Sequence, residues 1–206
     1  AGALELADTA RLLKKRGQAM QKAVPVGEGA MAAILGLDLL DVQPIVKQAS
    51  EQAGCDFVCE TANDNSPGQI VVSGHSAAVE IAKNIATENG AKKAVLLPVS
   101  APFHCSLMAP AAQTMSYALA DTDIRPPRVP VVANVTAKEE SDPSQIRRLL
   151  VDQITAPVRW RESVIWMAEN GVENMIELGA GKVLSGLVRR INKEIACESV
   201  GTTEQV

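Results

Sequence analysis

Apolar residues recur every three to four positions in the first part of the chain, as they do on one face of an α-helix. The pattern runs over residues 5–23 and stops before Pro25, whose ring lacks an amide hydrogen and cannot continue a helix. We therefore predict a first helix over residues 5–23. Its apolar face carries Leu6, Ala10, Leu13 and Met20.

Residues 30–99 alternate between short apolar runs and amphipathic stretches. The order is strand, helix, strand, strand, helix, strand, which is the split unit of ferredoxin-like folds. We therefore predict a ferredoxin-like (βαββαβ) subdomain over residues 30–99. The predicted strands are residues 30–37, 56–63, 69–74 and 91–100, and the predicted helices are residues 39–54 and 76–90.

The alternation becomes looser after residue 99. These later elements resemble half of an open α/β layer whose other strands lie outside this chain. The fold class is therefore α/β. The predicted helices are residues 110–120, 142–153 and 161–170, the predicted strand is residues 131–135, and residues 174–191 read as strand, glycine turn and helix.

The composition excludes several classes of function. A net charge of -4 and 2% aromatic residues give neither a basic field nor a stacking surface for nucleic acid. No apolar run approaches the roughly 18 residues that a membrane span needs, so we expect no membrane partner. The first residue is not methionine and the chain opens as if already inside a helix, so we expect a piece of a longer protein.

The cysteines indicate a reducing compartment. Four cysteines form no C-x-x-C pair, and two histidines are too few for a zinc site, so we expect no metal. Cysteines in a chain with a core of this size usually stay reduced and buried, which fits a cytoplasmic protein. They are Cys55, Cys59, Cys105 and Cys197.

One sequence motif resembles a nucleophile elbow. In residues 71–82, a strand, Gly74-His75-Ser76 and a helix follow one another, which is the context that exposes a catalytic serine. The elbow also needs a second glycine, and Ala78 stands in its place. The alternative is that Ser76 caps the helix with its side-chain oxygen.

A second candidate is His104 in the sequence Ala-Pro-Phe-His-Cys, between a predicted strand and a predicted helix. Such positions present catalytic groups in α/β folds, and a neutral imidazole can take a proton from a serine and return it to a thiol. The alternative is a structural histidine at a helix start.

A third candidate, Gly179-Ala180-Gly181-Lys182, lacks the spacing of a nucleotide phosphate loop. Its glycines fit a tight turn from strand into helix instead.

Six stretches in order along the chain resemble signatures of bacterial malonyl-CoA:acyl carrier protein transacylases. The stretches are RGQAMQKAVPVGEGAMAAILGL, NSPGQIVVSG, LPVSAPFHCSLM, PVVANV, ITAPVRWRESV and ELGAGKVLSGLVRRI. The resemblance implies that residues 1–29 and 100–206 are part of an α/β-hydrolase-like acyltransferase domain, into which residues 30–99 are inserted.

The resemblance also implies a function in fatty acid biosynthesis. In this family an active-site serine takes malonyl from malonyl-CoA and passes it to the phosphopantetheine thiol of acyl carrier protein. The expected substrate is thus a coenzyme A thioester, the expected partner is acyl carrier protein, no cofactor is expected, and the expected form is a cytoplasmic monomer.

The family's functional residues match four positions here. His104 matches the catalytic histidine, and Gln153 matches a glutamine whose backbone carbonyl receives the imidazole proton. Arg16 matches the arginine that binds the malonyl carboxylate, although a Lys14-Lys15-Arg16 run is also typical of a solvated helix face. Asn65 matches a position near the substrate entrance, although a turn-forming asparagine explains it equally well.

The sequence also departs from the family. The N-terminal part with the Gly-His-Ser-x-Gly elbow and the oxyanion-hole glutamine has no counterpart here, so we expect residues 1–206 to be inactive alone. Two other functions remain open. One is a hydrolase that uses Ser76 and His104. The other is a carrier-protein binding module without catalysis. Its basic residues are Lys182, Arg189, Arg190 and Lys193.

Overall fold

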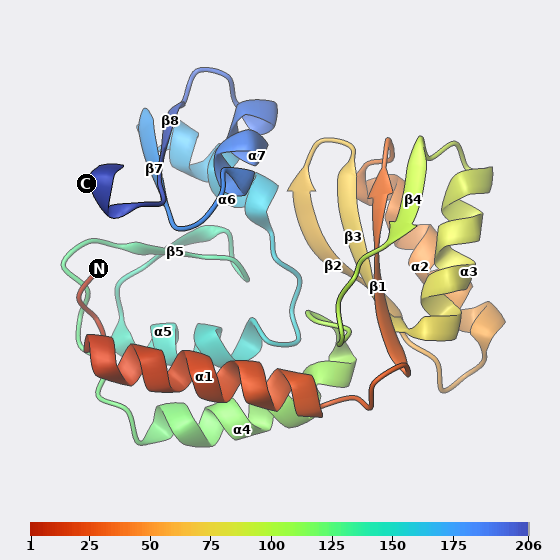
Figure 1. Ribbon diagram of the computed structural model, residues 1–206, viewed down its shortest axis with the longest axis horizontal. Coiled ribbons are helices and arrows are strands. Elements are labelled where there is room, and N and C mark those ends of the chain that lie inside the picture. The colour runs from red at the N-terminus through yellow and green to blue at the C-terminus, as the bar shows by residue number, and fades with distance from the viewer. Residues whose placement is uncertain (206) are drawn as a thin grey trace.

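The computed structural model describes residues 1–205, and one part of it is a four-stranded antiparallel sheet covered by two helices, at the right of Figure 1. The strand order is β2-β3-β1-β4, and the chain order is βαββαβ, as the sequence predicts. The elements are β1 (Gly29–Leu35), α2 (Leu39–Ala53), β2 (Cys59–Ser66), β3 (Gln69–His75), α3 (Ser76–Glu88) and β4 (Lys93–Leu96).

The core of this part lies between the sheet and its helices. Ala32 and Ile34 on β1 and Ile70 and Val72 on β3 pack on the face that α2 and α3 cover, whereas Met31 and Val71 belong to a separate buried cluster. The buried helix residues of the same cluster are Val42, Ile45, Val46, Ala49, Ala78, Val79, Ala82, Ile85 and Ala86.

Three helices form a second core at the lower left of Figure 1, where α1 and α4 lie side by side. Met20 of α1, Met115 and Leu119 of α4 and Ile146 of α5 belong to one buried cluster. Asp142 caps α5 by accepting a hydrogen bond from the amide of Gln145. The helices are α1 (Leu6–Lys22), α4 (Ala109–Ala120) and α5 (Pro143–Asp152).

The remaining elements are two short sheets and two helices. The parallel pair of β7 and β8 lies beside α6 and α7, and β5 pairs antiparallel with β6. Neither β6 nor β8 is predicted from the sequence. The elements are β5 (Val131–Ala133), β6 (Lys138–Glu140), α6 (Trp160–Glu169), β7 (Asn174–Leu178), α7 (Val183–Ile191) and β8 (Ala196–Val200).

The two larger parts are joined by hydrogen bonds as well as by the chain itself. Val158 donates to the carbonyl of Ala62 on β2 and accepts from the amide of Asp64, forming a parallel bridge at Asn63. The mixed helices and sheets confirm the predicted α/β class. Within residues 1–205, no helix has both the length and the apolar character needed to cross a membrane.

Candidate functional site

His104 stands in a left-handed backbone conformation, with φ of 59°. Such a conformation is uncommon for a residue with a side chain and typically costs about 1–3 kcal/mol, so it persists where neighbouring contacts enforce it. A loop of residues 97–103 separates His104 from β4, because that strand ends at Leu96. A 3₁₀ helix at Ser106–Met108 follows, and the buried Cys105 donates its thiol to the carbonyl of Pro102.

The imidazole of His104 is held by a backbone carbonyl. Its Nδ1 lies 3.0 Å from the carbonyl oxygen of Gln153, just after α5. Because a carbonyl only accepts, the Nδ1 nitrogen carries the proton when the ring is neutral, and the lone pair is on Nε2. The contact predicted for these two residues is therefore present, and the side chain of Gln153 is not needed for it.

The protonation state of His104 suits a base. Burial is the largest cause that lowers the pKa of His104 below its ordinary 6.5. The hydrogen bond to Gln153 opposes this decrease in pKa, and the positive charge of Arg16 adds to it. The ring is thus neutral near pH 7 and can accept a proton at Nε2.

Arg16 differs from the two lysines that precede it on α1. Lys14 and Lys15 are exposed, whereas Arg16 is half-buried, and burial lowers the pKa of its guanidinium. Across residues 1–205, no carboxylate lies within ion-pair distance of Arg16 and no hydrogen bond engages its side chain. A half-buried cation without a partner is available to bind an anion.

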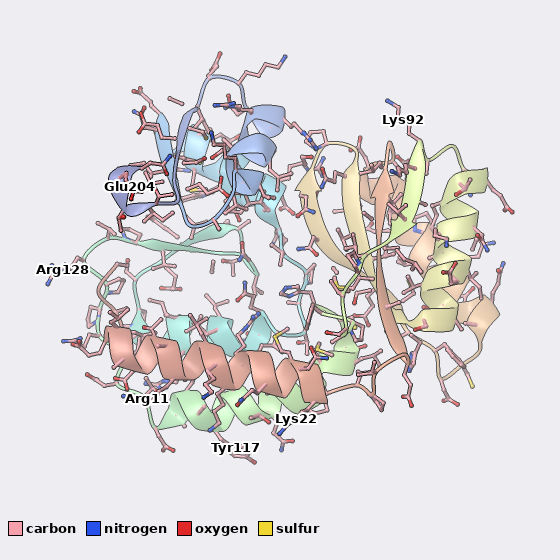
Figure 2. All side chains as sticks on the ribbon, in the orientation of Figure 1. Arg11, Lys22, Lys92, Tyr117, Arg128 and Glu204 are labelled. Carbon is pink, nitrogen blue, oxygen red and sulfur yellow. The ribbon has the colours of Figure 1, made fainter. Side chains whose placement is uncertain are left out.

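Arg16 and Gln153 line the same cavity, which has a volume of about 270 Å³. The cavity lies between α1, α4 and α5, and its wall is otherwise mainly apolar. In contrast, the exposed side chain of Tyr117 extends away from α4 at the lower edge of Figure 2. The other lining residues are Leu4, Thr9, Leu12, Leu13, Met115, Leu119 and Leu150.

Asn65 does not line this cavity. It lies within β2 at an irregularity in the pairing with β3, between Asp64 and Ser66. The turn that follows is made by Pro67 and Gly68, so the turn-forming alternative for Asn65 is wrong. The structure therefore links His104 to Gln153 by a hydrogen bond and to Arg16 by its charge, and it shows no such contact for Asn65 within residues 1–205.

The elbow-like motif has another structural role. A Cβ atom on Gly74 would lie 1.9 Å from the carbonyl oxygen of Val58, so glycine is required for strands β2 and β3 to approach. His75 accepts the amide hydrogen of Val58 at Nδ1, over 2.9 Å. Ser76 is the first residue of α3, and its hydroxyl donates to the carbonyl of Gly27 at 2.8 Å. The predicted capping of the helix by Ser76 is therefore wrong.

The glycine turn before α7 has the predicted form, since Gly179 and Gly181 have φ values of 135° and 91°. The N-terminus of α7 is already occupied by a carboxylate, because Glu177 accepts hydrogen bonds from the amides of Leu184 and Ser185. These two amides therefore have a partner within this chain.

Two further charged residues, both on β2, were not found from the sequence. Glu60 accepts hydrogen bonds from both the amide and the hydroxyl of Ser106, two residues after His104. The buried Asp64 pairs with Arg161 on α6. The only sequence signal is a charge within the predicted strand 56–63 for Glu60 and directly after it for Asp64. In the part of the chain that the structure describes, no cluster of three potential metal ligands occurs.

Comparison with known proteins shows a match to the acyl transferase domain family over residues 1–205. The malonyl CoA-acyl carrier protein transacylase of Bacillus subtilis is 43% identical over the whole chain, and that of Escherichia coli K12 is 48% identical over 93% of it. The chain spans only 64% and 60% of the lengths of these two relatives.

Solved structures give the same result. An acyl-carrier-protein S-malonyltransferase from Bartonella henselae is 54% identical, with a TM-score of 0.94 over 99% of this chain and 64% of that protein. A malonyl-transacylase solved in complex with a type II PKS acyl-carrier protein is 40% identical, with a TM-score of 0.94 over all of this chain and 65% of that one.

Proposed function

This chain belongs to the acyl transferase domain family, and on that premise we propose that it carries the base and the carboxylate-binding residue of a malonyl transferase. The observation that carries the proposal is that a neutral imidazole, held by a backbone carbonyl, lies near a cation that has no ion-pair partner within residues 1–205. His104 provides the first and Arg16 the second, and the charge of Arg16 reaches the ring of His104.

In the proposed reaction, His104 acts twice. Its Nε2 takes the proton of a serine hydroxyl as the oxygen attacks the malonyl thioester, and it then gives that proton to the departing thiolate of coenzyme A. In the second half, Nε2 takes the proton of the carrier thiol as its sulfur attacks the malonyl ester, and returns it to the serine. Gln153 keeps the ring in the tautomer that leaves Nε2 free.

Arg16 selects the acyl group in this proposal. Malonyl differs from acetyl by a free carboxylate, and a planar guanidinium can donate two parallel hydrogen bonds to it. The apolar wall of the cavity strengthens this interaction, because water is displaced from around the charges. An acetyl group would leave Arg16 without a partner.

The substrates proposed are malonyl-CoA and the phosphopantetheine thiol of acyl carrier protein, in fatty acid biosynthesis. The names of the Bacillus subtilis and Escherichia coli relatives support both. The solved complex of a related transacylase with a carrier protein supports the second.

The nucleophile is not among the contacts of His104. Within residues 1–205, no serine hydroxyl is hydrogen-bonded to its ring, and Ser76 donates to Gly27 instead. We infer that the serine is supplied by another segment of polypeptide and that residues 1–206 alone do not turn over malonyl-CoA.

The two alternative functions receive less support. The hydroxyl of Ser76 and the Nδ1 of the neighbouring His75 are both engaged with backbone, which disfavours a hydrolase built on Ser76. Arg190, one of the basic residues considered for carrier binding, donates to Gln69 of β3 at 2.7 Å, so it already has a partner within this chain.

The experiment compares Arg16→Ala and Lys15→Ala in a transferase that contains these residues together with its nucleophilic serine. We expect Arg16→Ala to lower kcat/KM for malonyl-CoA by about 100-fold or more, as loss of charge-assisted hydrogen bonds does, and to leave acetyl-CoA largely unaffected. The exposed Lys15 is the matched control and should change neither value. A retained preference for malonyl in Arg16→Ala would overturn the assignment.

The intact mass of residues 1–206 after exposure to malonyl-CoA tests the inference that these residues alone do not turn over malonyl-CoA. We expect no adduct. A malonyl group mapped to Ser76 would contradict the proposal and favour the hydrolase-like site.

A further inference from the structure

Strand β2 contacts the polypeptide on both sides of the His104–Gln153 hydrogen bond. Glu60, near its start, binds the turn that carries His104. Asp64, near its end, binds the segment that follows Gln153. The two residues that meet in the site are far apart in sequence, and a single strand of the small sheet is hydrogen-bonded to the segments of both.

The contact at Glu60 is bidentate. One carboxylate oxygen accepts the amide hydrogen of Ser106 at 2.9 Å, and the other accepts its hydroxyl hydrogen at 2.7 Å. Ser106 is two residues after His104, whose backbone is in the unfavourable left-handed region. Hydrogen bonds to a charged group are among the stronger ones, so Glu60 helps to hold a conformation that His104 would otherwise leave.

The contact at Asp64 has a backbone and a side-chain component. Its amide donates to the carbonyl of Val158 at 3.0 Å, and its carboxylate accepts from Nε of Arg161 at 2.9 Å. Pro157 stiffens the chain just before Val158. The backbone of Ala156, the residue before Pro157, acts to raise the pKa of His104. The tether at Asp64 is therefore close to the groups that hold the ring.

We propose that Glu60 and Asp64 are positioning residues, which set the His104 turn and the Gln153 segment at the spacing that the Nδ1 hydrogen bond requires. This inference rests on the proposed role of His104 as the base. It gives the small sheet a part in the chemistry, since β2 is the common support of both sides of the pair.

The two histidines supply a direct measurement. His104 donates from Nδ1 to a carbonyl, whereas His75 accepts an amide hydrogen at Nδ1, so the two neutral rings are opposite tautomers. Nitrogen-15 NMR separates protonated from unprotonated ring nitrogens. Because the sequence has only two histidines, the spectrum of residues 1–206 gives the tautomer of His104 with His75 as an internal reference.

The experiment measures the ratio of the Nδ1–H to the Nε2–H tautomer of His104 in Glu60→Ala, Glu60→Gln and Asp64→Ala. We expect about a tenfold drop in that ratio for Glu60→Ala and a smaller drop for Asp64→Ala. Glu60→Gln should be close to wild type, because the amide can still accept from the Ser106 amide and donate to its hydroxyl. His75 should keep its tautomer in all three.

Val79→Ala is the control for a general loss of stability. Val79 is fully buried in the core of the small sheet, so the substitution leaves a cavity and lowers the free energy of unfolding. It does not touch either tether, and we expect the His104 ratio to be unchanged. An equal drop in Val79→Ala and Glu60→Ala would overturn the proposal, as would a wild-type ratio in both Glu60→Ala and Asp64→Ala.

The measurement uses no substrate, so it separates this inference from the proposed function. If the ratio drops as expected but His104→Ala does not impair malonyl transfer, positioning stands and the assignment of the base fails. If Glu60→Ala does not fold, Asp64→Ala decides the question. If the ring of wild-type His104 is not the Nδ1–H tautomer, both the positioning proposal and the assignment of His104 as the base are contradicted.

Discussion

The guanidinium of Arg16 lies close enough to His104 for its charge to lower the pKa of the imidazole. Arg16→Ala removes that charge, so we expect the pKa of His104 to rise. The acid limb of malonyl transfer, which follows protonation of the free base, then moves to higher pH. Titration of the His104 ring by NMR measures the shift. Lys15→Ala on the exposed face of α1 is the control, and an equal shift there would point to net charge instead of proximity.

The His104–Gln153 contact predicts unequal effects of two substitutions. His104→Ala removes the base and should lower kcat of a transferase containing these residues by about 10²- to 10⁴-fold. Gln153→Ala keeps the carbonyl that binds Nδ1, so we expect a loss within about tenfold. Steady-state turnover with malonyl-CoA and carrier protein measures both. Comparable losses would mean that the Gln153 side chain has a role of its own.

The ion pair of Asp64 and Arg161 predicts an asymmetry in stability. The Asp64 side chain is 4% exposed and that of Arg161 is 24% exposed. Burial raises the pKa of Asp64 despite the opposing charge of Arg161, so the pair only partly offsets desolvation. Arg161→Ala leaves the buried carboxyl of Asp64 without this ion-pair partner and should lower the free energy of unfolding by about 3 kcal/mol. Asp64→Ala leaves an arginine that is also 3.8 Å from Asp38, and should cost less. Urea unfolding ranks the two, and the reverse order would contradict this account.

Replacing glycine by alanine should have opposite effects on stability at two positions. Gly17 lies in the middle of α1, and a methyl group there would meet no neighbouring side chain within 4 Å, so Gly17→Ala should stabilise the protein by about 0.5–1 kcal/mol. Gly74→Ala would force a methyl group against the Val58 carbonyl and should destabilise by about 3 kcal/mol. Thermal or urea unfolding measures both. A tolerated Gly74→Ala would show that β2 and β3 can separate at this point.

Much of the secondary structure follows from local pattern. The predicted helix over residues 5–23 is α1 within one residue at each end, because its periodicity and stop signal are both local. β4 ends earlier than predicted, because Pro98 has no amide hydrogen to extend the ladder. β6 was missed because Lys138–Glu140 is fully charged, and its strand geometry comes only from pairing with β5.

The site is less accessible to such reasoning. Residue types and spacing alone left His104 as either a base or a structural histidine, and the resemblance decided for the first. Its contact with Gln153 spans 49 positions in sequence, which no periodicity encodes. Arg161 was not singled out because its partner, Asp64, belongs to the other part of the molecule. Local patterns specify elements, whereas these contacts depend on how the elements assemble.

The chain enters the small sheet at the start of β1 and leaves it at the end of β4, and these two ends are neighbours. Ala32 pairs with Leu96, and the amide of Leu97 donates to Met31 at 2.8 Å. A segment that begins and ends at neighbouring points can be inserted into a host domain without displacing the rest of that domain. The hydrogen bonds of Glu60 to the His104 turn would make the loss of such a segment costly, because its deletion would also remove support for the proposed base.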